Sequence, residues 1–117
     1  MSESKVCSSE EIIEIKKLMH SNDDLVLASA FFKSFSDPTR LTIVNALYVH
    51  GALCVSDLCE ILNMSKSAVS HQLSKLRRYN LVKIRNEGRR VFYALSDSHV
   101  KQVFAMTMSH IKEEDCD

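Results

Sequence analysis

The chain has 117 residues, of which 45% are hydrophobic and 26% charged, and its 15 Lys and Arg balance its 15 Asp and Glu. This length suits one domain with a modest core and excludes two, so dimerisation would help to bury apolar surface. No apolar run approaches the roughly 20 residues that cross a bilayer, and the polar start MSESKVCSSEE lacks the layout of a signal peptide. We therefore expect a cytoplasmic protein with no membrane contact and reduced cysteines.

The first half of the chain predicts three helices. Ser8 and Glu11 have the spacing of a capping box, and apolar residues then recur at helical intervals, which indicates a helix over residues 9–20. After a break at SNDD, apolar residues over 25–35 continue the helical spacing as a second helix. In the following SDPTR the aspartate is a helix cap and the proline fits the first turn, so a third helix begins there and ends at Gly51.

Two short helices and a hairpin follow. Residues 55–62 and 65–78 predict the helices, which the dipeptide NM separates, with Ser65 as the cap of the second. The runs LVKIR and RRVFYAL are rich in β-branched and aromatic residues, and in the NEG that joins them Asn86 and Gly88 can take the positive φ of a tight turn. The expected fold is therefore mainly α with a small β-hairpin, a winged helix-turn-helix.

A final helix is predicted from a cap at Ser96 or Asp97, and its apolar face is larger than a small domain needs for its own core. A second subunit would cover the excess, so we expect a homodimer through the terminal helices. The expected organisation is an N-terminal extension with the first helix over 1–22 and a single winged helix-turn-helix domain with a C-terminal dimerisation helix over 23–117.

Charge is distributed unevenly along the chain. Residues 66–90 carry eight Lys or Arg and one acid, a net charge of +7, whereas the remainder carries seven basic and fourteen acidic residues, a net charge of −7. A basic segment on an acidic body is an electrostatic footprint for a polyanion, here double-stranded DNA. A solvated basic face on an ordinary helical protein is the alternative interpretation.

The second helix of the helix-turn-helix carries the candidate DNA contacts. Val69, Leu73 and Leu76 share one face that would dock on the core. Short polar side chains on the opposite face let a helix approach base edges closely, while flanking basic residues suit phosphates, which supply affinity rather than sequence choice. The outward residues are Lys66, Ser67, Ser70, His71 and Ser74, and the candidate phosphate contacts are Lys66, Lys75, Arg77, Arg78 and, in the hairpin, Arg85, Arg89 and Arg90.

The segments SDPTRLTIVNAL and LCVSDLCEILNMSKSAVSHQLSKLRRYNLVKIRNEGRRVFYAL, with the final DSH and HIKE, resemble the ArsR/SmtB family of bacterial metal-responsive repressors across nearly the whole chain. The resemblance implies a homodimeric winged helix that binds an operator as the metal-free protein and leaves it on binding metal ions. It also implies that the regulated genes encode an efflux pump or a metallothionein. We expect a transcriptional repressor and not an enzyme.

Two histidines on the final helix are candidate metal ligands. His99 and His110 are eleven residues apart, so they lie within about 20° around the helix axis but about 16 Å apart along it. Asp97 accompanies the first, and Glu113 follows the second by one turn. If two copies of the helix pack antiparallel about a two-fold axis, two identical sites form, each with two imidazoles and two carboxylates. That set suits tetrahedral Zn²⁺, which Co²⁺ can mimic, and its spacing is also that of the family's zinc sensors.

These four residues have two other interpretations. Helical histidines are usually surface or core-edge residues without a ligand. Histidine and carboxylate ligands also build hydrolytic zinc sites, but neither a second domain nor a candidate general base is evident, and all four ligand positions are filled by protein.

A second candidate metal site lies in LCVSDLCE, where Cys54 and Asp57 are three residues apart and face alike. The resemblance implies that Cys7 of the N-terminal extension completes such a site. Family members specialised for cadmium and lead usually read Cys-Val-Cys here, whereas this chain has Ser56 at the second cysteine position. The alternative to zinc regulation is therefore a Cd²⁺- or Pb²⁺-responsive repressor, or a redox-responsive one that uses these thiols or Cys59.

Overall fold

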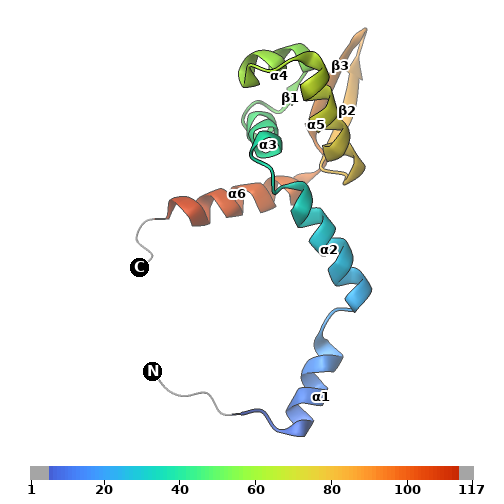
Figure 1. Cartoon of the computed structure of the whole chain (residues 1–117), viewed down its shortest axis with the longest axis vertical. Helices are drawn as coiled ribbons and strands as arrows, with labels where there is room; N and C mark the ends of the chain where they lie inside the picture. The colour runs from blue at the N-terminus through green and yellow to red at the C-terminus, as the bar shows by residue number, and fades with distance from the viewer. Residues whose placement is uncertain (1–5, 114–117) are drawn as a thin grey trace.

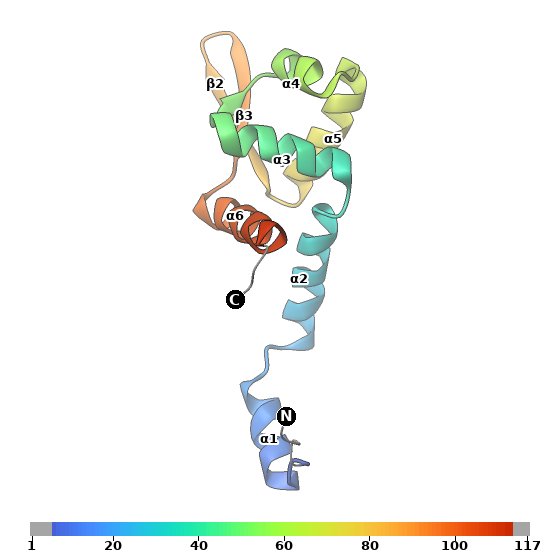
Figure 2. The ribbon, with the colours of Figure 1, turned by 90° about the vertical axis from the view of Figure 1, so that its left-hand side faces the viewer.

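In the computed structural model, residues 6–113 are described, and they form six helices and one three-stranded antiparallel sheet (Figure 1). None of these helices is both long enough and apolar enough to cross a bilayer. Figures 1 and 2 show α3, α4, α5 and the sheet gathered in one body, α6 crossing beneath it, and α2 leading away to α1. In chain order the elements are α1 (Ser9–Leu18), α2 (Asn22–Ser34), α3 (Pro38–His50), β1 (Ala52–Leu53), α4 (Val55–Leu62), α5 (Lys66–Arg78), β2 (Val82–Glu87), β3 (Arg90–Leu95) and α6 (Ser98–Lys112).

Helix α1 begins with the predicted capping box. The Ser8 hydroxyl accepts the backbone N–H of Glu11 at 3.1 Å, and the Glu11 carboxylate accepts the backbone N–H of Ser8 at 2.8 Å. The break before α2 is shorter than SNDD, because Ser21 is itself a cap that accepts the Asp24 backbone N–H at 3.1 Å. No residue of α1 is buried in the single chain.

Helix α3 forms as the sequence predicts. The Asp37 carboxylate accepts the Arg40 backbone N–H at 3.0 Å, and Pro38 occupies the first turn, where its missing N–H costs no hydrogen bond. At the other end Gly51 has a φ of 101°, a conformation open to glycine, and its N–H donates to the Leu47 carbonyl.

The predicted helix-turn-helix is confirmed as α4 and α5. Asn63, after the last residue of α4, has a φ of 56°, and the Met64 N–H donates to the Cys59 carbonyl at 3.1 Å. This left-handed residue ends α4 and reverses the chain into α5, whose cap Ser65 accepts the Ala68 N–H at 3.1 Å. Asparagine is one of the few residues other than glycine that adopt this conformation readily, so the NM dipeptide carries the turn.

The wing is confirmed, with one correction to its turn. Strands β2 and β3 pair antiparallel up to Glu87 opposite Arg90, and Gly88 has a φ of 64°. The expectation that Asn86 also has a positive φ is wrong, because the two-residue connection leaves Asn86 inside β2, opposite Val91. Strand β1 was not predicted; it pairs with the other edge of β3 and is too short to show any alternation of apolar and polar residues.

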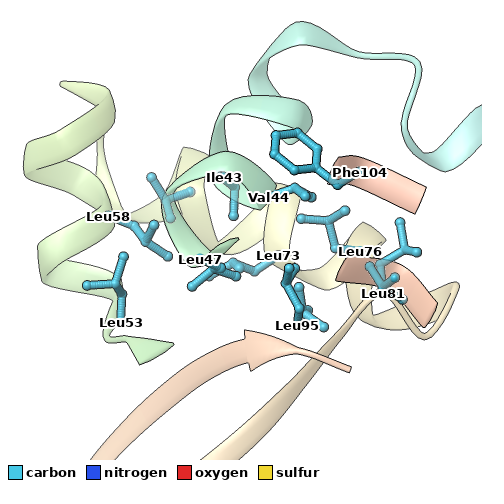
Figure 3. Packing of buried hydrophobic residues seen from close by; sticks show 13 residues of the cluster. Ile43, Val44, Leu47, Leu53, Leu58, Leu73, Leu76, Leu81, Leu95 and Phe104 are labelled. Atoms are coloured by element: carbon cyan, nitrogen blue, oxygen red, sulfur yellow. The ribbon is translucent and has the colours of Figure 1, made fainter. Parts of the chain in front are cut away.

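The core lies where α3, α4, α5, α6 and the sheet meet (Figure 3). From α6 it takes Val100 and Phe104, so the N-terminal half of that helix is anchored in the domain. The cap of α6 is Asp97 rather than Ser96, since the Asp97 carboxylate accepts the Val100 N–H at 3.1 Å. The fully buried side chains are Ile43, Val44, Leu47, Leu58, Val69, Leu73, Leu76 and Leu81.

Two valines of α3 provide a matched test of this packing. Val44 is 0% exposed and Val49 is 78% exposed. Val44→Ala should lower the free energy of unfolding by about 2 kcal/mol, through lost burial and the cavity left behind. Val49→Ala should change it by less than about 0.5 kcal/mol. Urea unfolding at one protein concentration measures both, and equal effects would contradict the assignment of α3 to the core.

Candidate functional site

Helix α5 presents two faces of different chemistry. Val69, Leu73 and Leu76 are buried against the core, as predicted. The opposite face is exposed, and because the buried residues hold the helix by one side only, this face is free to enter a groove. Its exposed residues are Lys66, Ser67, Ser70, His71, Ser74, Arg77 and Arg78, whereas Lys75 is partly buried at the edge. The helix therefore offers hydroxyls and an imidazole at its centre and cations around them.

The wing adds arginines at its tip. Arg89 and Arg90 are exposed and form no ion pair within residues 6–113. Arg85 donates to the Glu87 carboxylate at 2.9 Å, and both side chains are about half exposed. An ion pair in this position stabilises a protein by less than about 1 kcal/mol, so a phosphate can displace Glu87 from Arg85.

Two further basic residues lie beside α5 and were missed by the sequence analysis. Lys33 of α2 and Arg40 of α3 line a hollow together with Lys75 and Arg78 of α5. Their separation along the chain hides this grouping from the sequence. One local signal in the sequence points to Arg40. The SDPTR motif places this arginine in the first turn of α3, where the helix dipole disfavours a cation, so the residue is not there to stabilise the helix.

The start of α6 holds the first pair of candidate metal ligands. Asp97 and His99 lie close together, with 3.7 Å between the Asp97 Oδ1 and the His99 Nδ1, and both side chains are exposed. The Asp97 carboxylate accepts the Val100 backbone N–H, and this bond is the main reason that the pKa of Asp97 lies below its ordinary value. The nearby His99 also lowers this pKa, whereas partial desolvation of the carboxylate raises it. Asp97 is therefore an anion at neutral pH, the form that binds metal ions.

The end of α6 holds the second pair. His110 and Glu113 are exposed, and the Glu113 backbone N–H donates to the His110 carbonyl at 3.3 Å. Fifteen residues of helix make α6 about 22 Å long, so the two pairs lie far apart within one chain. Between residues 6 and 113, the single chain brings no three His, Cys, Asp or Glu side chains into one metal-binding group.

Cys54 and Asp57 are brought together as their spacing predicts. The Cys54 thiol donates to the Asp57 carboxylate at 3.1 Å and lies 3.2 Å from the Ser56 hydroxyl. Cys7 is exposed just before α1, which lies at the opposite end of the molecule from α4 in Figure 1. One chain in this conformation therefore does not assemble the three predicted ligands. Cys59 packs against the core instead.

A helix-turn-helix with an exposed polar recognition face and a basic wing defines a winged helix-turn-helix DNA-binding protein. Residues 37–83 match the family described as bacterial regulatory protein, arsR family. The chain is 39% identical over 106 residues to the transcriptional repressor SmtB homolog of Synechocystis sp., which covers 91% of this chain and 80% of that protein. The chain therefore belongs to the ArsR/SmtB family of metal-responsive transcriptional regulators, and it is a regulator rather than an enzyme.

The chain is also similar to two other proteins of known type. The cadmium resistance transcriptional regulatory protein CadC homolog of Staphylococcus aureus is 40% identical over 82 residues, which are 70% of this chain and 68% of that protein. The homodimeric winged helix-turn-helix DNA-binding domain Mb0332 of Mycobacterium bovis superimposes with a TM-score of 0.74 at 24% identity, covering 82% of this chain and 91% of that domain. The second comparison confirms the predicted winged helix-turn-helix fold.

Proposed function

We propose that this protein is a homodimeric cytoplasmic repressor that binds operator DNA in its metal-free form and leaves it when Zn²⁺ binds between the two α6 helices. The observation that carries the proposal is the division of the ligands along α6. Asp97 and His99 form an exposed pair at the anchored end, and His110 and Glu113 lie exposed at the other. Each pair is half of a four-ligand zinc site, so each needs a second chain.

Apolar surface beside α6 supports the dimer. Met106 and Ile111 of α6 are 73% and 66% exposed, and Phe32 of α2 is 61% exposed. Phe32 and Ile111 line one apolar hollow of about 190 Å³ between α2, α3 and α6. Water contact at so many large apolar side chains is unfavourable, and a second copy packed antiparallel along α6 would remove it. Mb0332, with the same fold, is described as homodimeric.

The ligand types favour zinc at this site. Two imidazoles and two carboxylates suit tetrahedral Zn²⁺ and its mimic Co²⁺, whereas Cd²⁺ prefers the thiolates that the α6 set lacks. The ion would also neutralise the two carboxylates that the antiparallel arrangement brings together. By linkage, zinc weakens DNA binding only as much as DNA weakens zinc binding, and a hundredfold effect corresponds to about 2.7 kcal/mol of coupling.

The contact between Cys54 and Asp57 favours a second candidate function, a Cd²⁺- or Pb²⁺-responsive site. The two side chains already lie 3.1 Å apart, and deprotonation of the thiol would leave a sulfur and an oxygen ligand side by side. Because α1 lies far from α4 within one chain, Cys7 would have to come from the other subunit. The similarity to a CadC homolog agrees with such a site.

The direct test measures DNA binding against metal concentration. A duplex selected by the metal-free protein from a random-sequence pool is titrated with the protein, and Zn²⁺, Co²⁺ and Cd²⁺ are then added in turn. We expect tight binding without metal and release by Zn²⁺ and Co²⁺. Release by Cd²⁺ alone would favour the cysteine site, and no release by any of the three would contradict metal regulation.

Mutants of α5 should separate base contacts from phosphate contacts. Ser70→Ala should weaken binding to the selected duplex about fivefold and spare an unrelated duplex, because base edges carry the sequence. Arg77→Ala should weaken both duplexes alike and make the salt dependence shallower. Fluorescence anisotropy over a series of salt concentrations measures both effects. Equal losses on the two duplexes for Ser70→Ala would show that Ser70 does not read bases.

Cys54→Ser tests which site regulates. The variant should keep zinc-driven release from DNA and lose the ultraviolet thiolate-to-metal absorption that Cd²⁺ produces with the unaltered protein. Absorption spectra and the DNA titration are recorded on the same sample, and Cys59→Ser is the control for a half-buried thiol outside the pair. Loss of the zinc response in Cys54→Ser would move regulation to the cysteine site.

Mixed dimers test whether the α6 site is shared between subunits. Homodimers of His99→Ala or of His110→Ala should lose both sites, because each site needs one histidine from each chain. A heterodimer of the two variants has one site that lacks both histidines and one that lacks neither, so it should bind one Zn²⁺ with near-normal affinity. Native mass spectrometry confirms the heterodimer and counts the metal. If the confirmed heterodimer bound no Zn²⁺ tightly, the intersubunit site would be excluded.

A further inference from the structure

A hollow of about 240 Å³ lies between the ends of α2 and α5 and the start of α3, and we refer to it as the basic hollow. It adjoins the exposed face of α5, with which it shares Arg78, and it lies apart from the candidate metal ligands. Three separate elements bring four cationic side chains to it. Its lining residues are Lys33, Ser34, Arg40, Lys75, Arg78 and Tyr79.

Arg40 is held in place within the basic hollow. Its Nε donates to the Ser34 carbonyl at 2.9 Å, and one of its terminal nitrogens donates to the Gln72 side-chain oxygen at 3.2 Å. A guanidinium has five N–H donors, so three further donors remain after these two bonds. The group is therefore oriented in advance between α2 and α5, and binding an anion would cost little side-chain entropy.

Within residues 6–113, the positive charge of the basic hollow has no counter-charge. No acidic residue lines it, and none of its four cations forms an ion pair within the part of the chain from residue 6 to residue 113. The nearest carboxylate along the chain, Asp37, is engaged as the cap of α3. Four cations around one hollow repel each other, and an anion with several acceptor oxygens would relieve this repulsion.

We propose that the basic hollow binds a phosphate of the operator backbone, so that the DNA contact extends from the helix-turn-helix to Lys33 and Arg40. The proposal rests on the proposed DNA binding. The hollow is continuous with the exposed face of α5, because Lys75 follows His71 by one helical turn and Arg78 belongs to that face. A duplex lying against His71 would therefore bring its backbone beside the hollow, which favours a phosphodiester over a free anion.

Lys33→Ala tests the proposal, with Lys101→Ala as the control. Both lysines are exposed and both changes remove one positive charge, but Lys101 lies on α6, outside the basic hollow. Lys33→Ala should weaken the metal-free protein about fivefold on selected and unrelated duplexes alike. It should also reduce the slope of log K against log salt by about 1.8, because each subunit of the dimer loses one phosphate contact and each contact contributes about 0.9. Lys101→Ala should leave the slope unchanged.

A scan with uncharged phosphates identifies the contact. Methylphosphonate is placed at one backbone position at a time in the selected duplex. The unaltered protein should lose affinity at one position in each half-site, and Lys33→Ala should lose less at that position, because one of the four cations is already absent. Arg40→Gln should behave in the same way. If loss of the Arg40 hydrogen bonds to Ser34 and Gln72 unfolds the domain, Lys33→Ala still tests the contact.

The outcomes separate the alternatives. An unchanged salt slope in Lys33→Ala, with the unaltered protein binding DNA, would overturn the phosphate contact. Binding of inorganic phosphate, seen as amide shifts at Lys33 and Arg40 in NMR spectra, together with an unchanged slope, would assign the hollow to a free anion and would also overturn it. Failure of the unaltered protein to bind any duplex would instead contradict the proposed function.

Discussion

The burial of α3 is the constraint on which the rest of the structure depends. Ile43, Val44 and Leu47 are completely shielded from water, and the helix that carries them contacts α4, α5, α6 and both β1 and β3. Each neighbouring element covers part of α3 with its own apolar residues, such as Leu58 of α4 and Phe104 of α6. Since apolar burial supplies most of the free energy of folding, the orientations of α5, of the wing and of α6, which carries the candidate metal ligands, all follow from how they pack on α3 (Figure 3).

Helix α6 is anchored at one end and unsupported at the other. Val100 and Phe104 fix its start in the core, so the candidate ligands Asp97 and His99 move with the DNA-binding body. Its second half passes the apolar hollow and ends at the exposed His110 and Glu113. In the proposed dimer, an ion shared between subunits would tie the exposed end of one α6 to the anchored end of the other, and would thereby restrain the distance between the two recognition helices.

The corner between α2 and α3 connects the two hollows of the molecule. Ser34 and Arg40 line the basic hollow, while their direct neighbours Phe35 and Leu41 line the apolar hollow against Phe104 of α6. A shift of α6 on metal binding would therefore act on the same short backbone segment that positions the Arg40 guanidinium. This gives the proposed coupling between metal and DNA a contiguous physical route through packed side chains, without any contact between the two ligands.

The sequence by itself determined the local structure, because caps, turn residues and apolar periodicity act between residues close together in the chain. The capping box at Ser8, the start and end of α3, the two helices of the helix-turn-helix and the wing were all predictable in this way, as was the proximity of Cys54 to Asp57. Family membership also followed from local motifs, whereas the roles of the candidate ligands are still predictions. Only the tertiary structure decided that Asn86 stays in the ladder, that α1 carries Cys7 away from α4, and that Lys33 and Arg40 join α5 around one hollow. These features depend on how elements pack across long stretches of chain, and packing against α3 brings together residues whose spacing in the sequence has no regular relation to their distance in space.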